Sequence, residues 1–308
     1  MSSFATFTVK QAAEKPVELN LTLSLSDLEH CDVLVQLFSD LDRLFSQDRG
    51  IDEVQFFPGN ALVWQQIAVK LPIFKAYILS RACFYQLPLH WHKHLTSSQF
   101  PFNEVQTHVQ YRHHPQRPPM PSGIVYERFD YDAQTNVSFR VFDIEKDLLR
   151  FARWMNDPRV AHFWEQAWSQ EKLAEFAVEQ LNDPHIIPLI GEFDGQPFGY
   201  VEAYWVAEDR LSSYYDVQPY DRGIHLLVGE EQFRGPRFFD AWMKAITHYL
   251  FIDDNRTQRI VLEPRSDNHR LFNRIEQVGY RKCFEFNFPH KRSALLMQTR
   301  SEFFKGQW

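Results

Sequence analysis

Glycine is the residue type that most restricts the turns this chain can form. Only 11 of its 308 residues are glycine, about half the share of an average globular protein. Seven of the 11 lie between Gly191 and Gly279. Because glycine enters left-handed backbone conformations at little cost, a chain this poor in glycine is expected to keep each one where the backbone requires it. We therefore expect the functional loops in this stretch.

Composition and charge exclude several classes of protein. Hydrophobic residues make up 44% and charged residues 24% of the chain, which is typical of an ordinary globular protein. The net charge of −7 argues against the broad basic surface that nucleic-acid binding needs. The N-terminus lacks the basic flank and apolar core of a signal peptide, and no apolar run is long enough to span a bilayer. We expect a cytoplasmic protein with neither a membrane nor a nucleic-acid partner.

Cysteine and histidine give little reason to expect a metal site. Cys31, Cys83 and Cys283 are odd in number and widely spaced, which fits neither a disulfide framework nor a zinc ribbon. The run His90-Trp-His-Lys-His94 places histidines on one face of a strand, where they could share an ion. No Cys, Asp or Glu lies within the run to complete a site. A solvated polar face is the favoured interpretation, and no metal is expected.

A proline-rich segment divides the chain. Four of the ten residues from His114 to Gly123 are proline, which cannot continue a helix or a central strand. We expect a smaller N-terminal α/β domain of unassigned role over residues 1–115, a linker over 116–123 and a larger domain over 124–308. The N-terminal part shows a helical apolar pattern and short strand-like runs without a chemical motif; these cover residues 27–38, 54–57, 61–64 and 84–87.

The larger domain has a clear order of elements. Asp194-Gly195 lies between two apolar runs, which is the strongest short signal for a hairpin. Apolar residues repeat at helical spacing in four other segments. The predicted order is β-α-α-β-β-β-α-β-α-β-β: strand 137–142, helix 144–155, a helix from 169, strands 188–193, 197–205 and 223–229, helix 237–251, strand 259–263, helix 268–278, and strands 281–287 and 293–299.

The segment from Gly223 to Phe238 is the best candidate for binding chemistry. It contains a strand, a short loop and a helix start, and Pro236 suits the first helical turn. Unpaired amides at that helix start, with Arg234 and Arg237 beside them, could hold a phosphate-like anion. The plain alternative is an ordinary strand–turn–helix with two solvated arginines.

Two motifs make this part of the chain resemble the GNAT superfamily of acyl-CoA-dependent N-acetyltransferases. Gln232-Phe-Arg-Gly235-Pro-Arg237 matches the first two landmarks of the family's pyrophosphate loop and departs at the last, where Arg237 stands. In the segment from Asn268 to Tyr280, Asn268, Gly279 and Tyr280 keep the family's later motif. Ile275 occupies the position of the tyrosine that usually protonates the departing CoA thiolate.

Further segments are similar to the siderophore-biosynthesis branch of that superfamily, in particular to the N-hydroxylysine acetyltransferases of the aerobactin pathway. The resemblance covers about 180 residues, from Gly123 to Phe303, through the segments 153–160, 163–166, 221–229, 256–259, 263–265, 267–268 and 288–292. It implies a mixed α/β (α+β) fold of the GNAT type, with a mostly antiparallel sheet flanked by helices and a smaller α/β domain before it.

The resemblance also implies an activity. The enzyme is expected to transfer an acyl group, in the first place acetyl from acetyl-CoA, to the hydroxylamine nitrogen of N-hydroxylysine, N-hydroxyputrescine or N-hydroxycadaverine. The product is a hydroxamate, used in siderophores to bind ferric iron. Siderophore-pathway enzymes are the expected partners of a monomer or homodimer. The residues expected to bind acetyl-CoA are Leu227, Val228, Gly229, Gln232, Arg234, Gly235, Arg237, Asn268 and Phe272.

His225 is the expected catalytic base. Alternation in strand 223–229 places His225 and Leu227 on one face and the remaining apolar residues on the other. A lone histidine in an apolar strand is more often a core residue, and the resemblance favours the catalytic role. Imidazole suits proton transfer near neutral pH. Asp267 is expected either to cap the following helix or to orient His225.

Aromatic and acidic residues in two segments are candidates for the acceptor site. An extended amine with charged ends needs an aromatic slot and one or two carboxylates. The tryptophans among them are equally suited to the core. The candidates are Trp154, His162, Trp164, Glu165, Glu202 and Tyr204.

Two alternative functions stay open at this point. Ile275 at the tyrosine position supports a non-catalytic acyl-CoA-binding or partner-docking protein on a degenerate GNAT scaffold. An acetyltransferase of protein or antibiotic amines would accept ordinary lysine or aminoglycosides as well as hydroxylamines. The sequence does not choose among the N-hydroxylated amines, does not set the acyl length, and leaves open whether Arg222, Arg265 or Lys291 reaches an acceptor carboxylate.

Overall fold

The computed structural model describes residues 17–19, 31–56, 65, 78–88, 90–106 and 113–306. Its contacts divide the chain into two compact units, residues 1–90 with 304–306 and residues 91–303. The division lies upstream of 116–123, the segment predicted as the linker. Residues 91–123 group with the second unit because they are tied to it: His92 contacts Asp253, and Arg117 contacts Glu208. The assignment of separate roles to a leading and a larger domain stays a prediction.

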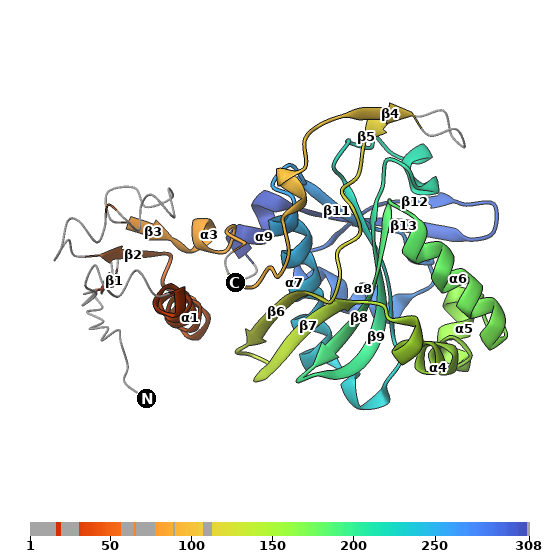
Figure 1. Ribbon diagram of the computed structural model, residues 1–308, viewed down its shortest axis with the longest axis horizontal. Coiled ribbons are helices and arrows are strands. Elements are labelled where there is room, and N and C mark those ends of the chain that lie inside the picture. The colour runs from red at the N-terminus through yellow and green to blue at the C-terminus, as the bar shows by residue number, and fades with distance from the viewer. Residues whose placement is uncertain are drawn as a thin grey trace. The chain divides into compact units, whose positions relative to one another are not determined.

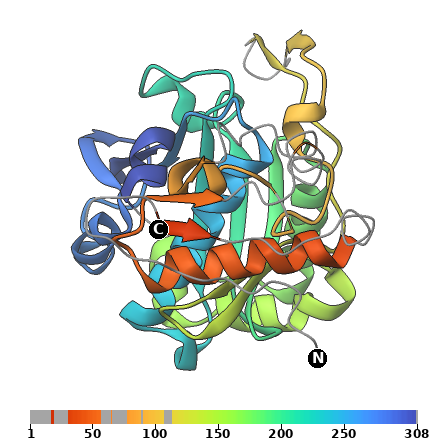
Figure 2. The same ribbon diagram turned by 90° about the vertical axis from the view of Figure 1, so that its left-hand side faces the viewer.

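The first unit is a small α/β arrangement. Strands β1 (Val17–Leu19), β2 (Glu53–Phe56) and β3 (Ile78–Ser80) form a three-stranded sheet. Helix α1 (Cys31–Gln47), seen along its length in Figure 2, is followed later by the short helix α3 (Arg81–Phe84). The buried Arg81 guanidinium donates hydrogen bonds to main-chain carbonyls at the end of α1 and in the loop after it. The strand expected at 61–64 lies outside the described residues.

An eight-stranded sheet forms the centre of the second unit (Figure 1). The strand order is β12-β13-β11-β10-β9-β8-β7-β6, and every pair is antiparallel except β10 with β11. The mostly antiparallel sheet predicted from the sequence is therefore confirmed. The strands are β6 (Ile124–Asp130), β7 (Thr135–Val141), β8 (Ile186–Phe193), β9 (Gln196–Trp205), β10 (Arg222–Val228), β11 (Arg259–Leu262), β12 (Arg281–Asn287) and β13 (Arg292–Thr299). A separate two-stranded sheet joins β4 (Glu104–Gln106) and β5 (His113–Pro115).

Helices cover both faces of the large sheet (Figure 1). Helix α6 packs on β8 together with α4, while α7 packs on β6 and β7 from the other side. The remaining helices are short. The helices are α4 (Ile144–Met155), α5 (Pro158–Trp164), α6 (Gln170–Asn182), α7 (Pro236–Asp253), α8 (His269–Ile275) and α9 (Arg300–Gly306), with 3-10 turns η2 (Ser97–Gln99), η3 (Arg210–Ser213), η4 (Glu231–Phe233) and η5 (Glu276–Val278).

Local signals account for most of these boundaries. The Asp143 and Ser169 side chains accept hydrogen bonds from the first amides of α4 and α6, which is the usual N-cap arrangement. Asp194 and Gly195 both have positive φ at the tip of the β8–β9 hairpin, as the Asp-Gly signal predicts. Amphipathic α4 buries Phe151, Trp154 and Met155 against the sheet.

Several elements of the second unit are absent from the sequence prediction, among them helix α5 and strand β6. Helix α5 has only seven residues, too few for a helical repeat, although Asp157 caps it and Pro158 opens it. Strand β6 contains a bulge between Ile124 and Tyr126, which disturbs the two-residue alternation on which strand prediction relies. In both cases the local pattern is too short or too irregular to stand out.

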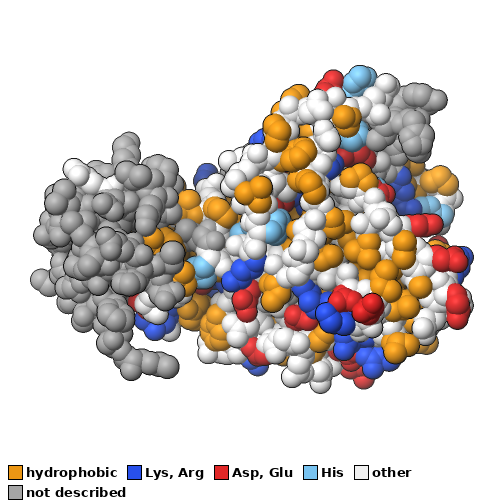
Figure 3. Space-filling view, in the orientation of Figure 1, with side chains coloured by type: hydrophobic (Ala, Val, Ile, Leu, Met, Phe, Trp, Pro, Cys, Tyr) orange, Lys and Arg blue, Asp and Glu red, His pale blue; other side chains and the backbone are white. Residues whose placement is uncertain are grey.

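The separation of β10 from β11 positions the functional site. The two strands pair in parallel only at Arg222–Gly223 with Ile260–Val261, and β10 continues beyond this point beside β9 alone. The carboxyl ends of both strands therefore border a gap in the sheet. On the face of the second unit seen in Figure 3, acidic and basic side chains are interspersed. Among the described residues, no helix has both the length and the apolar character needed to cross a membrane.

Candidate active site

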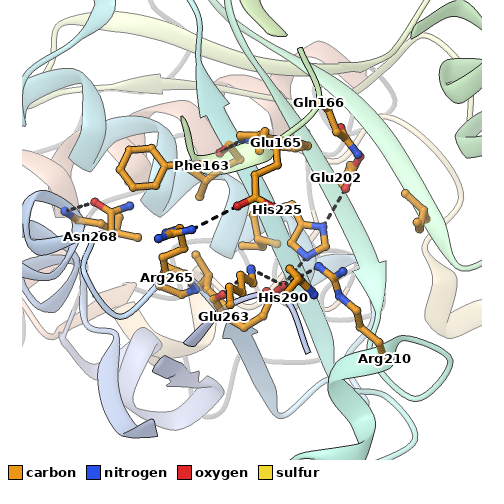
Figure 4. A pocket seen from close by; sticks show the side chains of 18 of the residues that line it. Phe163, Glu165, Gln166, Glu202, Arg210, His225, Glu263, Arg265, Asn268 and His290 are labelled. Carbon is orange, nitrogen blue, oxygen red and sulfur yellow. Dashed lines mark hydrogen bonds and ion pairs between the residues drawn. The ribbon is translucent and has the colours of Figure 1, made fainter. Parts of the chain in front are cut away.

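A cavity of about 550 Å³ opens where β10 and β11 separate. Its walls come from these two strands, from α5 and α6, and from the turn between β12 and β13 (Figure 4). Trp164, Trp168 and Phe176 give the cavity an aromatic surface, and several charged side chains also line it. An aromatic slot with a few fixed polar groups is the usual form of a small-molecule site.

His225 lies in this cavity between two buried carboxylates (Figure 4). Its Nδ1 is 2.8 Å from Glu202 on β9, and its Nε2 is 2.9 Å from Glu263, which follows β11. The Tyr204 ring packs against the imidazole with a centroid distance of 4.5 Å, and the Tyr204 hydroxyl donates to Glu263. Since a carboxylate accepts hydrogen bonds, both ring nitrogens act as donors and His225 is an imidazolium.

The charges of the trio are interdependent. Burial lowers the pKa of His225, but the ion pairs and hydrogen bonds with Glu263 and Glu202 outweigh burial and raise it to about 10. Burial raises the pKa of Glu263, but the neighbouring His225, Lys291 and Arg210 hold it well below its ordinary value. The trio of one imidazolium and two carboxylates thus carries one net negative charge.

The loop after β10 has free groups that suit a polyphosphate. Gly235 has a φ of 113°, and α7 begins beyond it without a side-chain cap, which leaves its first amides unpaired. Arg234 donates one hydrogen bond to Glu231, at 3.1 Å. Its buried Nε and Nη2 have no hydrogen-bond acceptor, although Nη2 forms a long ion pair with Asp157 at 3.9 Å. These groups fit the pyrophosphate of coenzyme A, as the sequence motif predicts.

The free edge of β10 offers backbone groups to the gap. The Gly229 amide donates to Phe198 on β9, and the Leu226 carbonyl accepts from the Trp164 indole on the other side. Because backbone groups alternate along a strand, Leu226 and Val228 direct their amides into the gap and Leu227 directs its amide to β9. Leu227 and Val228 are both expected to bind acetyl-CoA, and of these two residues Val228 has its backbone amide available to the gap. Leu227 instead packs its side chain in the core beside Trp154.

The other predicted coenzyme residues differ in their placement. Arg237 does not face the loop, because its guanidinium donates to the Ala133 carbonyl in the β6–β7 turn. Gly229 has a packing role, since a Cβ there would come within 2.2 Å of the Trp154 ring. Gln232 is exposed in η4, and Phe272 is half-buried in α8. Asn268 caps α8 by accepting from the Leu271 amide, and it lines the cavity.

The structure does not bring Asp267 to His225. The Asp267 side chain is 56% exposed and pairs with Arg265 at 3.1 Å. The cap of α8 is its neighbour Asn268, so neither role expected of Asp267 is observed. The physical reason is that Glu202 and Glu263 already occupy both nitrogens of His225.

Three of the six predicted acceptor residues line the cavity: Trp164, Glu165 and Glu202. Tyr204 lies against His225, as described above. Trp154 is a core residue, 1% exposed, whose indole donates to Glu230. His162 is exposed, contacts the Phe163 ring edge to face, and is not among the residues that line the cavity.

Glu263 is the site residue that sequence reasoning missed. A signal was present, because Glu263 is the last residue of the strand predicted at 259–263, and parallel neighbouring strands bring their carboxyl ends together. Without the pairing of β10 and β11 that signal could not be tied to His225. Arg210 and Lys291 also line the cavity, as does Arg265. Arg222 does not, because it is fully buried, ion-paired with Asp253 and stacked on Trp205.

The histidine run at 90–94 forms a buried network instead of a solvated face. His92 is 8% exposed and lies 2.9 Å from Asp253, and the His94 Nε2 is 3.9 Å from the same carboxylate oxygen. These three residues have the spacing of a possible metal-binding group. Asp253 also accepts from Ser97 and from Arg222, so the carboxylate is already neutralised and fully hydrogen-bonded. An ion-pair network that ties residues 92–97 to α7 explains the cluster.

Sequence and structure comparisons point to one family. Residues 143–288 match the acetyltransferase (GNAT) domain family. The chain is 41% identical over 306 residues to the N(6)-hydroxylysine O-acetyltransferase of Escherichia coli, covering 94% of this chain and 93% of that protein. It is 39% identical over 198 residues to the N(5)-hydroxyornithine:cis-anhydromevalonyl coenzyme A-N(5)-transacylase of Beauveria bassiana, covering 62% of this chain and 43% of that one. The chain thus spans less than half the length of the fungal relative.

A solved structure supports the fold. The crystal structure of an uncharacterized protein from Bacillus halodurans superimposes with a TM-score of 0.58 and 27% identity, covering 61% of this chain and 96% of that chain. The resemblance seen in the motifs is confirmed, and the identity to the E. coli protein extends over nearly the full length of both chains. The chain belongs to the GNAT acyltransferases, in their siderophore-biosynthesis branch, and is an acetyl-CoA-dependent acyltransferase.

Proposed function

We propose that this enzyme transfers acetyl from acetyl-CoA to the hydroxylamine nitrogen of an N-hydroxylated lysine or diamine, forming a hydroxamate for siderophore assembly. The observation that carries the proposal is the Glu202–His225–Glu263 trio in a cavity at the separated ends of β10 and β11. Support also comes from the hydroxylysine and hydroxyornithine acyltransferases among the relatives.

The coenzyme binds along the gap in this proposal. The Arg234 guanidinium and the uncapped amides of α7 hold the pyrophosphate, and the Val228 amide binds the pantetheine arm. When bound, acetyl-CoA supplies an activated thioester. The unpaired donors of Arg234 are satisfied by phosphate oxygens, which removes the cost of leaving buried N–H groups without acceptors.

The trio moves the proton. The hydroxylamine nitrogen attacks the thioester carbon, a C–N bond forms, and the C–S bond breaks. As the C–N bond forms the nitrogen becomes acidic, and it loses one proton to a carboxylate of the trio, because both nitrogens of His225 are already protonated. The thiolate gains one proton as CoA leaves, so the reaction releases none. Ile275 is fully buried and apolar and cannot donate that proton.

The proposal acylates nitrogen, whereas the name of the E. coli relative specifies oxygen. Nitrogen is the better nucleophile in a neutral hydroxylamine, and only the N-acyl product is a hydroxamate with two oxygens for ferric iron. The test measures free thiol from acetyl-CoA with N-hydroxylysine, N-hydroxyputrescine and N-hydroxycadaverine, and the colour of the product with ferric ion. Thiol release with a ferric-binding product is expected.

Each alternative predicts a different outcome of this assay. Thiol release without a ferric complex would show O-acylation. Equal turnover with lysine or an aminoglycoside would show a general amine acetyltransferase. No thiol with any hydroxylamine would show a non-catalytic acyl-CoA-binding protein.

We also propose that the enzyme works in the cytoplasm, beside other enzymes of the pathway, as a monomer or homodimer. Support comes from the use of acetyl-CoA and from Cys83 and Cys283, which are exposed free thiols suited to a reducing compartment. Fractionation of cells tests the cytoplasmic location, and light scattering of the purified protein tests the oligomeric state.

A further inference from the structure

Three basic side chains surround one aromatic ring at the edge of the active-site cavity. The Arg210 guanidinium lies 5.0 Å from the centre of the Phe288 ring, and the Lys291 Nζ lies 5.5 Å from it. The His290 ring stacks on Phe288 at 5.6 Å. Phe288 itself is only 4% exposed. Arg210 comes from η3 and the other two from the β12–β13 turn, so the fold brings them together.

These side chains line the same cavity as His225, and Figure 4 shows Arg210 reaching toward Glu263 beside His290. Arg210 and Lys291 each lie 3.7 Å from Glu263 Oε1, which is too far for a hydrogen bond. That oxygen already accepts from His225. Lys291 donates to the main-chain carbonyl of Glu263, at 3.1 Å.

The two cations beside Glu263 are only partly neutralised by this carboxylate. Burial lowers the pKa of His290, and the charges of Arg210 and Lys291 lower it further. The pKa of Lys291 is lowered by burial and by Arg210, against the opposing effect of Glu263. The Glu202–His225–Glu263 trio carries one net negative charge and Arg210 and Lys291 carry two positive charges, so one positive charge remains at this edge. Glu165, across the cavity, is paired with Arg265.

We propose that Arg210, His290 and Lys291 form a carboxylate-binding subsite, and that one of the two substrates brings a carboxylate to it. The inference rests on the proposed function. A monoanion fits best, because the nearby Glu263 repels a more highly charged group. The carboxylate has two sources: the acceptor, as in N-hydroxylysine, or a dicarboxylic acyl group, as in succinyl-CoA.

Four substrate pairs distinguish these sources. N-hydroxylysine and N-hydroxycadaverine differ by the acceptor carboxylate, while succinyl-CoA and acetyl-CoA differ by the acyl carboxylate. We expect kcat/KM to be about tenfold or more higher for one singly carboxylated pair than for acetyl-CoA with N-hydroxycadaverine, as one charge-assisted hydrogen bond can supply. The favoured pair identifies the source.

Variants test whether the proposed subsite causes the preference for a carboxylated substrate. Arg210→Gln is expected to bring the ratio of kcat/KM between the favoured pair and the carboxylate-free pair close to one. The main cause should be a higher KM for the carboxylated substrate. Arg210→Lys is expected to restore part of the ratio, because it keeps the charge and loses the planar fork. The matched control is Arg292→Gln, which removes the same charge from the next residue of the hairpin, outside the cavity lining.

Two results would contradict the proposed carboxylate-binding subsite. One is equal kcat/KM for the carboxylate-free and the singly carboxylated pairs in the wild type. The other is an Arg210→Gln variant that lowers all four pairs by the same factor. Absence of thiol release with every pair is a different result, since it would overturn the proposed function itself.

Discussion

At the scale of single residues, His225 owes its charge to its two neighbours. Glu202 and Glu263 are buried, and each accepts one hydrogen bond from the imidazole. A histidine expected from the sequence to be an ordinary base is therefore an imidazolium held between two carboxylates. Its role depends on carboxylates that are 23 and 38 residues away in the chain.

Removing the imidazole should abolish most turnover. His225→Ala is expected to lower kcat/KM by about 10²- to 10⁴-fold, the usual contribution of a positioned acid–base group. Thiol release measures the loss. His113→Ala is the control, since this exposed histidine also pairs with a glutamate but lies on β5, outside the cavity lining. Turnover of His225→Ala at the wild-type rate would remove His225 from the mechanism.

The charge of His225 should also make the free energy of unfolding depend on pH. Its pKa is raised from 6.5 to about 10 in the folded protein. A raised pKa stabilises the fold fully below the unfolded value and less as pH rises toward the folded value. The difference in unfolding free energy between wild type and His225→Ala should therefore shrink from pH 6.5 to pH 10. Urea unfolding at three pH values tests this, and a difference that grows with pH would contradict it.

At the scale of elements, the β10–α7 connection combines an unusual backbone with a free helix start. Gly235 has φ 113° and ψ 165°, a conformation almost confined to glycine. A Cβ at this position meets no atom within 4 Å, so a substitution strains only the backbone. The strain caused by a substitution would fall on the turn that orients the first amides of α7.

Gly235→Ala should therefore weaken coenzyme binding. The expected backbone cost is about 1–3 kcal/mol, which corresponds to a several-fold or greater rise in KM for acetyl-CoA. Gly123→Ala is the control, because Gly123 also has a positive φ and open space but lies before β6. Equal KM values for both variants would mean that the loop does not bind the coenzyme.

At the scale of the whole molecule, buried charges tie residues 92–97 to α7. Asp253 is fully buried and contacts His92, Ser97 and Arg222. The side chains of His92 and Arg222 are also almost completely buried. This network explains why residues 91–123 group with the second unit.

Asp253→Asn should destabilise the protein strongly, because it leaves the Arg222 charge buried without a counter-ion. Breaking a buried pair typically costs about 3–5 kcal/mol. Urea unfolding measures the change. Asp132→Asn is the control, since that side chain is 61% exposed and its distant pair with Lys244 should contribute little. A similar small effect for both variants would contradict a central role for the network.

The sequence was sufficient where the signals are local. The Asp194-Gly195 turn, the caps at Asp143 and Ser169, and the glycine-bounded strand before α7 depend on neighbouring residues, and the structure contains all of these elements. The gap-bordering position of His225 also agrees with the motif. Helix α5 and strand β6 were not predicted, because a short helix and a bulged strand lack a regular repeat of apolar residues.

Only the tertiary structure decided which charged groups meet. Asp267 is near in sequence to the coenzyme motif but turns to Arg265, whereas Glu263 reaches His225 because β10 and β11 are parallel neighbours. Arg210 and Lys291 converge on Phe288 from separate loops, and Asp253 completes the cluster of His92. The physical reason is that turns and caps are formed within a few residues, while ion pairs depend on strand order and packing. By itself, the glycine-poor sequence determined most elements of the large sheet and the strand–loop–helix around Gly235; the packed sheet determined which charged groups surround His225.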